Sequence, residues 1–322
     1  MTLYASNRLY LQTPKNEERM IEPSIDQLIP FTGLRKLSLF KKESRSADLN
    51  NAEKKFISLL SSIEEPVYFT KKIVDGLLLW EVITDSNTIN FWLKQRVETS
   101  DFDFILWPNK YFESPKLLVF DMDSTFIQIE VIDELARRHG VGDSVSKVTE
   151  AAMRGELDFA ESLVSRVACL HGLDSSTIED VANNLPLSEG VEKLVKQSRK
   201  HQVKTTIVSG GFTPFVSHLK NELDLFEVKA NDLEVVDGVL SGKVLGNIVD
   251  AEAKARFVNE LKDKLRIHKN EILTIGDGAN DLLMMQESGF NLAYRAKPTV
   301  QQQAKGRMNW TFLNHLISVF NW

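Results

Sequence analysis

Two aspartates that end an apolar run are the first candidates for chemistry in this sequence. Residues 117–125 read LLVFDMDST, so Asp121 and Asp123 directly follow a buried-looking segment. In an extended chain, residues two apart point to the same side, and we expect both carboxylates to face one cleft. Carboxylates that close together repel unless a cation neutralises them or one holds a proton. The alternative is a solvated acidic loop, and the short motif alone does not exclude it.

A second acidic turn offers further oxygen atoms to a metal ion. Asp277 follows the apolar run ILTI, and Asp281 comes four residues later in the stretch GDGAND. Carboxylates from two separate strand ends are the oxygen ligands that Mg²⁺ prefers. The two turns together therefore predict a magnesium site.

A third turn and one lysine have the chemistry to hold an anion beside these acids. In the stretch SGG, Ser209 offers a hydroxyl and Gly210 a backbone N–H that no side chain obstructs. Lys254, in DAEAKARF, would balance the negative charge where a phosphate lies next to several carboxylates. The ordinary alternatives are a plain tight turn and a solvated lysine on a helix.

The elements that must position these residues follow an α/β pattern. The runs KLLVF, KTTIV and EILTI each end in a polar or glycine-rich turn and lead towards a helix. Runs apolar on both faces, alternating with helices, predict a doubly wound, mostly parallel sheet over residues 115–322. The mostly helical insert at about 131–200 is expected to form a cap over the carboxyl ends of the strands. A β-hairpin over 233–246 and a helix over 310–320 complete this domain.

Residues 1–108 predict a separate, small α+β domain. Strands are expected over 34–40 and 101–107, helices over 46–63 and 86–97, and a hairpin over 66–84 that turns at Asp75–Gly76. This order is ferredoxin-like and resembles an ACT domain, a module that often senses amino acids. The loop KKESRSAD lacks the glycine that ACT domains usually carry there, so a scaffolding role as a homodimer is favoured over amino-acid binding. Residues 1–30 are weakly patterned, and we make no prediction for their structure.

Composition restricts the class of protein and its partners. The chain has 322 residues, of which 43% are hydrophobic and 26% charged, as in globular proteins. Its formal charge of −6 argues against nucleic acid or an anionic membrane as a partner. No apolar stretch approaches the length of a membrane span, and the N-terminus does not resemble a signal peptide. The single cysteine, Cys169, excludes an internal disulfide, so we expect a cytoplasmic protein.

Together, DMDST, SGG, the lysine and GDGAND resemble the haloacid-dehalogenase-like hydrolase family, and within it the phosphoserine phosphatases, over about residues 115–296. The resemblance implies that Asp121 is the nucleophile and forms an aspartyl-phosphate. It implies that Asp123 is a general acid and then a general base. It also implies Mg²⁺ held by the carboxylates of Asp121 and Asp277 and the backbone carbonyl of Asp123, with Asp281 in support.

The same resemblance implies how a substrate is held. Three residues would bind the phosphoryl oxygens: Ser209, Gly210 and Lys254. Asn280 would lie near the phosphate, Arg166 would bind a substrate carboxylate, and Glu130 would accept an ammonium group. Met153 and Phe159 would shield the site when the cap closes. Without the resemblance, the four cap residues would be interpreted as surface or core positions.

The implied reaction is the Mg²⁺-dependent hydrolysis of O-phospho-L-serine, the last step of serine biosynthesis. The alternative is a related phosphatase or phosphotransferase that acts on another small phosphomonoester or hydroxy amino acid. A third hypothesis is a regulatory protein with an inactive core. Asp121, Asp123, Lys254 and Asp277 are all present, which argues against that hypothesis.

Overall fold

The computed structural model of the chain describes residues 5–12, 18–21, 34–42, 46–60, 67–74, 76–85, 89–90, 100–108 and 114–322. Two compact units divide the chain. One comprises Met1–Ser114, Leu292–Arg295 and Ala304–Trp322, and the other comprises Pro115–Asn291 and Ala296–Gln303. The predicted domain ranges 1–108 and 115–322 stay a prediction, because compactness does not establish which segments fold independently.

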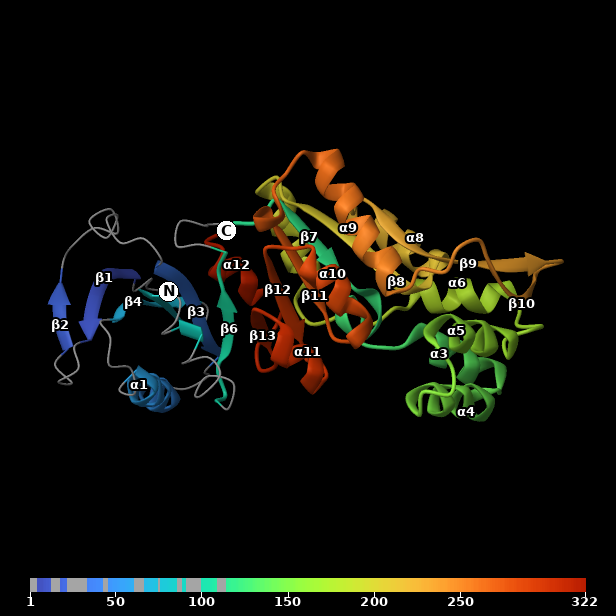
Figure 1. The fold of residues 1–322 in the computed structure, drawn as a ribbon, viewed down its shortest axis with the longest axis horizontal. Coiled ribbons are helices and arrows are strands. Elements are labelled where there is room, and N and C mark those ends of the chain that lie inside the picture. The colour runs from blue at the N-terminus through green and yellow to red at the C-terminus, as the bar shows by residue number, and fades with distance from the viewer. Residues whose placement is uncertain are drawn as a thin grey trace. The chain divides into compact units, whose positions relative to one another are not determined.

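A mostly parallel sheet forms the centre of the Pro115–Asn291 unit (Figure 1). Four strands run parallel, and β10 pairs with β9 in the opposite direction. In spatial order they are β10 (Val239–Leu245), β9 (Val228–Val236), β8 (Lys204–Phe212), β7 (Leu117–Phe120) and β11 (Ile272–Gly276). The α/β prediction and its three strands are confirmed. The hairpin is also present, and its first strand, β9, joins the main sheet by pairing with β8.

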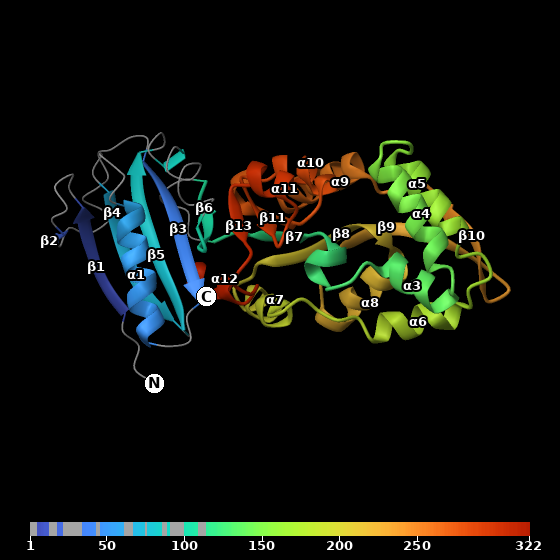
Figure 2. The ribbon, with the colours of Figure 1, turned by 90° about the horizontal axis from the view of Figure 1, so that it is seen from below.

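Helices cover both faces of this sheet (Figure 2). Helices α7 (Val191–Lys200) and α8 (Thr213–Leu223) lie on one face, and α9 (Ala251–Leu265), α10 (Leu282–Gln286) and α11 (Pro298–Gln303) lie on the other. Helix α9 begins at Asp250, whose carboxylate accepts the N–H of Ala253 at 2.8 Å and satisfies a backbone donor at the helix end. Its apolar side buries Phe257, Val258 and Leu261 against the sheet. This packing fixes α9 beside the ends of the strands.

Four helices occupy the predicted insert between β7 and β8: α3 (Val131–His139), α4 (Gly142–Met153), α5 (Phe159–Ala168) and α6 (Ser175–Asn183). Helix α5 starts with a capping box, in which the side chains of Asp158 and Glu161 each accept the other's backbone N–H. The turn after α5 is tied to the hairpin, because Gly172 N donates to Leu240 O and Leu240 N to Leu173 O, each at 2.8 Å. That this insert closes as a cap stays a prediction.

The Met1–Ser114 unit contains an antiparallel sheet and helix α1 among its described N-terminal residues, and residues 89–90 are also helical. Its strands follow the spatial order β6 (Asp103–Leu106), β3 (Leu34–Lys42), β5 (Leu77–Asp85) and β4 (Val67–Val74). This is the strand order of a ferredoxin-like arrangement, and α1 (Ser46–Leu60) is the predicted first helix. The predicted second helix, 86–97, lies outside the described residues except for 89–90. The ACT-like assignment stays a prediction.

Further strands extend this sheet at both edges. At one edge, β1 (Ala5–Gln12) pairs with β4, and β2 (Glu18–Ile21) pairs with β1. At the other edge, β13 (Gly306–Met308) pairs with β6 and with the end of β12 (Phe290–Tyr294). The predicted C-terminal helix is present as α12 (His315–Val319). Stacked rings of Phe56 and Trp80, 4.7 Å apart, anchor α1 on the sheet.

None of the helices in the described part of the chain is long and apolar enough to cross a membrane.

Candidate active site

The turn after β7 directs two carboxylates into one cavity. Asp121 ends the strand, and the chain then makes a wide turn over Met122–Phe126 in which Ser124 takes a left-handed conformation with φ 55°. Such a conformation is costly for a residue with a side chain and is held here by its surroundings. Asp121 and Asp123 both line a cavity of about 470 Å³. They share a cleft, as the sequence predicts, although the turn rather than strand alternation places Asp123 there.

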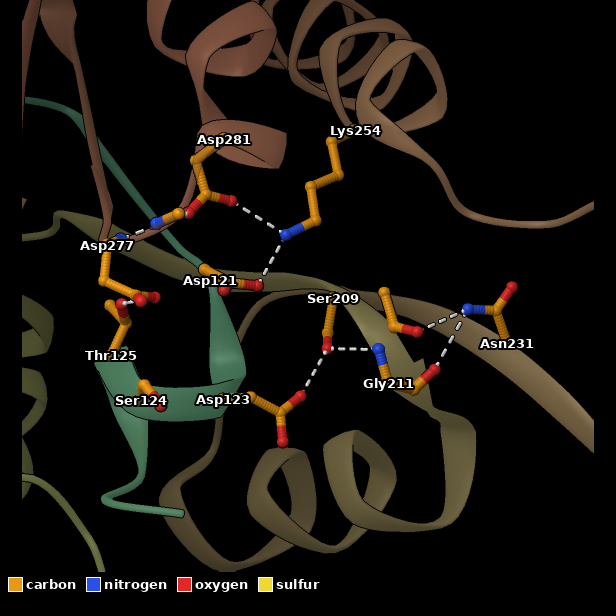
Figure 3. A network of polar contacts seen from close by, with 12 residues as sticks. Asp121, Asp123, Ser124, Thr125, Ser209, Gly211, Asn231, Lys254, Asp277 and Asp281 are labelled. Atoms are coloured by element: carbon orange, nitrogen blue, oxygen red, sulfur yellow. Dashed lines mark hydrogen bonds and ion pairs between the residues drawn. The ribbon is translucent and has the colours of Figure 1, made fainter. Parts of the chain in front are cut away.

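Three carboxylates from β7 and the turn after β11 form a tight cluster (Figure 3). Oxygen atoms of Asp121, Asp277 and Asp281 all lie within 4.8 Å of one another. The Asp281 carboxylate accepts the backbone N–H groups of Asp277 and Gly278, each at 3.1 Å. It packs directly on Gly276, where an added Cβ would lie 2.4 Å from Asp281 Oδ2. Glycine is therefore required at this position for the turn to fold around the acid.

Lys254 provides a buried positive charge to this cluster. Its Nζ lies 2.6 Å from Asp121 Oδ1 and 2.8 Å from Asp281 Oδ1. Burial lowers the pKa of the Lys254 ammonium, but the charges of Asp121 and Asp281 outweigh burial and raise it, so the group stays charged. One ammonium faces three carboxylates in this cluster.

The remaining negative charge is visible in the pKa values of the acids. Burial and the nearby charge of Asp281 raise the pKa of Asp121 well above its ordinary value. The same two causes raise the pKa of Asp277 to about 6. Acids destabilised in this way gain most from a divalent cation, and their oxygen atoms are suitable ligands for one. The cluster therefore fits a divalent metal ion.

Asp123 has a different set of partners. Its Oδ1 accepts the N–H of Val131, the first residue of α3, at 2.8 Å, and its Oδ2 accepts the Ser209 hydroxyl at 3.3 Å. Burial, followed by the charge of Glu130, raises the pKa of Asp123 to about 7. A carboxyl with such a pKa can both donate and accept a proton near neutral pH.

The SGG segment, predicted as a turn, lies within β8 near its carboxyl end and next to Asp123. The Gly211 N–H donates to Ser209 Oγ at 2.8 Å. Gly211 has no room for a side chain, since an added Cβ would lie 2.7 Å from Asp123 Oδ2. The Asn231 amide donates to the carbonyls of Gly210 and Gly211 at 2.8 and 3.1 Å (Figure 3). These bonds fix the backbone beside the acid.

The predicted cap residues and Asn280 line the same cavity: Glu130, Met153, Phe159, Arg166 and Asn280. Glu130 accepts the Ser124 hydroxyl at 2.8 Å. Burial lowers the pKa of the Arg166 guanidinium, while the acids Asp133, Glu130 and Asp123 act in the opposite direction. Met153 is 84% exposed, so its side chain contributes little buried packing.

The structure thus brings all twelve predicted site residues together, although three of them lie behind the cavity wall. Ser209, Lys254 and Asp281 do not line the cavity themselves. Ser209 contacts it through Asp123, Lys254 through Asp121, and Asp281 through Lys254 and the backbone N–H of Asp277.

Several residues of the site were not selected from the sequence. Thr125 donates its hydroxyl to Asp277 Oδ1 at 3.1 Å, and its place in DMDST was a usable signal. Lys297 lines the cavity, and its backbone N–H donates to Asp277 O at 3.0 Å. Lys297 and Asn231 lie outside every short motif, so only the folded chain brings them to the site.

Comparison with known proteins assigns the family. The sequence profile of the haloacid dehalogenase-like hydrolases matches residues 115–289, more than half of the chain. A phosphoserine phosphatase of Archaeoglobus fulgidus is 42% identical over 228 residues, which are 70% of this chain and 66% of that protein. A phosphoserine phosphatase of Idiomarina loihiensis is 47% identical over 196 residues, 61% of this chain and 89% of that one.

Solved structures agree with this assignment. An unliganded probable phosphoserine phosphatase from Vibrio cholerae matches with a TM-score of 0.71 and 32% identity, over 89% of this chain and 86% of that chain. A phosphoserine phosphatase that carries an analogue of a phospho-aspartyl intermediate matches with a TM-score of 0.59 and 34% identity, over 64% of this chain and 99% of that chain. The chain therefore belongs to the haloacid dehalogenase-like hydrolases. Within that class it is a phosphatase, and its similarity is to the phosphoserine phosphatases.

Proposed function

We propose that this protein hydrolyses O-phospho-L-serine to L-serine and phosphate, as the last step of serine biosynthesis in the cytoplasm. The observation that carries the proposal is the cluster of Asp121, Asp277 and Asp281 around Lys254, with Asp123 beside it. Relatives at 42–47% identity are phosphoserine phosphatases, which supports the choice of substrate.

Mg²⁺ is the metal that this cluster would hold. The carboxylates of Asp121 and Asp277 and the backbone carbonyl of Asp123 would be ligands, and Asp281 would support them from behind. A bound Mg²⁺ offsets the negative charge of the site, so that an anionic phosphate can approach a carboxylate. Thr125 holds Asp277 by a hydrogen bond of 3.1 Å and would keep that ligand in position.

In the first half of the reaction, an oxygen of Asp121 attacks phosphorus and the bond between phosphorus and the serine oxygen breaks. Asp123, protonated in a fraction of molecules because its pKa is raised to about 7, gives its proton to the departing oxygen. Ser209, Gly210 and Lys254 would hold the three phosphoryl oxygens as their charge changes. Lys254 is suited to this role because it is charged, buried and 2.6 Å from Asp121.

In the second half, water replaces serine. Asp123, now ionised, accepts a proton from a water molecule, whose oxygen attacks phosphorus and breaks the bond to Asp121. Phosphate leaves and both aspartates regain their starting states. Asn280, on the cavity wall, would hydrogen-bond near the phosphate.

The residues on the insert would select the amino-acid part of the substrate. Arg166 would bind its carboxylate, because a planar guanidinium can donate two parallel hydrogen bonds to that group. Glu130 would accept its ammonium, and Met153 and Phe159 would shield the reaction from water.

For the ferredoxin-like unit we retain the proposal of a scaffolding role as a homodimer.

A substrate panel tests the proposal. The purified protein is given O-phosphoserine, O-phosphothreonine and an aryl phosphate, each with and without Mg²⁺. We expect kcat/KM to be at least about tenfold higher for O-phosphoserine than for the aryl phosphate, since binding of its carboxylate and ammonium is worth at least ~1.4 kcal/mol. O-phosphothreonine carries the same two charged groups, so it tests whether the site also accepts the additional methyl group. Removal of Mg²⁺ should stop all hydrolysis. Equal values on all three esters would exclude specificity for O-phosphoserine but not the phosphatase chemistry, and appearance of phosphate on an added hydroxy amino acid would indicate a transferase.

A further inference from the structure

Asn231 connects two segments of the backbone at the edge of the active site. It lies on β9 opposite Phe212 of β8 and is 1% exposed. Its Nδ2 donates to Gly210 O at 2.8 Å and to Gly211 O at 3.1 Å, and its Oδ1 accepts the N–H of Val249 at 2.7 Å. Both the nitrogen and the oxygen of the side-chain amide are thus hydrogen-bonded. Because Nδ2 meets carbonyl oxygens and Oδ1 meets an N–H, only one orientation of the amide satisfies both.

The first of these bonds acts on Asp123 through two further bonds. In a trans peptide the C=O and N–H point in opposite directions, so a fixed Gly210 carbonyl directs the Gly211 N–H away from Asn231. That N–H donates to Ser209 Oγ at 2.8 Å, and the Ser209 hydroxyl donates to Asp123 Oδ2 at 3.3 Å. Figure 3 shows this series of contacts from Asn231 to Asp123. A rotation of one peptide plane would therefore release Ser209 and leave Asp123 with the Val131 N–H as its remaining hydrogen-bond donor.

The Val249 bond acts on the other side of the site. Val249 precedes Asp250, the residue that caps α9, and Lys254 lies in the first turn of that helix. Lys254 N donates to Asp250 O at 2.9 Å, so the position of Asp250 determines the position of the Lys254 backbone, from which the side chain extends. Asn231 thus fixes the relative position of the SGG turn and the helix that carries the buried ammonium.

We propose that Asn231 is a positioning residue for phosphoryl transfer, which keeps Ser209 and Asp123 aligned with the leaving group by holding the Gly210–Gly211 peptide. This inference rests on the proposed function. The competing explanation is structural: the pairing of β8 with β9 is irregular between Val208 and Phe212, and in that explanation Asn231 only bridges the irregularity. The two explanations differ in which esters a variant fails to hydrolyse.

The test uses Asn231→Leu, which keeps the side-chain size and removes the hydrogen bonds. Asn247→Leu is the matched control, because Asn247 is exposed on the connection between β10 and α9. The kcat/KM values are measured on O-phosphoserine and on 4-nitrophenyl phosphate. The alkoxide of serine needs a proton from Asp123, whereas 4-nitrophenolate leaves without one. We expect Asn231→Leu to lower kcat/KM about tenfold more for O-phosphoserine than for the aryl ester, because it impairs general-acid catalysis.

Two reference measurements complete the experiment. Asp123→Asn should show the same preference for the aryl ester. The Mg²⁺ affinity of Asn231→Leu, measured by calorimetry, should stay within about twofold of the wild-type value, because the substitution removes no metal ligand. An equal fall on both esters, or no fall, would overturn the role of Asn231 alone. Wild-type protein that hydrolyses neither ester would overturn the proposed function together with this inference. If Asn231→Leu does not fold, Asn231→Asp, which keeps the acceptor for Val249, decides by the same ratio.

Discussion

The two ends of the active-site cavity differ in how firmly their side chains are held. At the strand ends, Asp121, Asp281 and Lys254 are at most 5% exposed, and each has hydrogen-bonded or ionic partners. At the helical insert, Glu130 is exposed and Met153 is 84% exposed. Groups that stabilise a change of charge must be held in position before the reaction. Groups at the entrance must be able to move aside so that a substrate can enter. We therefore propose that chemistry and substrate selection depend on separate parts of this cavity.

The largest effect is expected at the strand ends, with Asp121→Asn. An amide cannot take up the phosphoryl group, so kcat should fall by at least about 10⁴-fold. The fold should persist, because the change removes a carboxylate from a site crowded with negative charge. Rates are measured by phosphate release and folding by circular dichroism.

The control for this variant is Asp143→Asn, an exposed acid in α4, which should be active. Substantial activity of Asp121→Asn would show that another group is the nucleophile.

Lys254→Met should separate catalysis from stability at the same end. Loss of the ammonium leaves the buried carboxylates of Asp121 and Asp281 uncompensated, so the free energy of unfolding should fall by about 3 kcal/mol in metal-free buffer. Added Mg²⁺ should restore part of it by replacing the lost charge, while kcat/KM should remain about 10³-fold reduced. Urea denaturation with and without Mg²⁺ measures the first effect.

Arg256→Met, an exposed change on the same helix, serves as the control and should alter neither quantity. Unchanged stability of Lys254→Met without metal would contradict the proposal that the Lys254 ammonium compensates these carboxylates.

Arg166→Ala tests selection at the other end of the cavity. It should lower kcat/KM for O-phosphoserine about 100-fold, mainly through KM, because a charged hydrogen-bonded pair is lost. An ester without a carboxylate should be affected only severalfold. Arg154→Ala removes an exposed arginine of the same insert, which is paired with Glu156, and should leave both substrates unaffected. An equal loss on both esters would assign Arg166 to the packing of the insert.

The smallest effect is expected for Met153→Ala. Because Met153 is 84% exposed, the unfolding free energy should change by less than about 0.5 kcal/mol. Turnover should fall about threefold if the side chain shields the closed site from water. Steady-state kinetics over a range of substrate concentrations would measure this. A fall as large as that of Arg166→Ala would contradict the separation between the two ends.

Much of the site could be predicted from short sequence motifs alone. The carboxyl ends of neighbouring parallel strands meet at one edge of a sheet, so motifs that follow β7, β8 and β11 must converge. These motifs contain glycines at 210, 211, 276 and 278, where the Phe159 ring, the Asp123 and Asp281 carboxylates and the Asn280 amide crowd the position of a Cβ. The α/β order, the hairpin and the first N-terminal helix were visible for a similar reason, since periodicity and turn residues are local properties.

What the sequence by itself determined is the set of reactive groups and the elements that carry them. Only the tertiary structure decided which atoms meet: that Lys254 joins Asp121 to Asp281, that Lys297 reaches the cavity, and that Asn231 holds the SGG turn. It also decided that β9 belongs to the main sheet and that β13 pairs with β6. These partners are far apart along the chain, and their pairing depends on how whole elements pack, which no local pattern records.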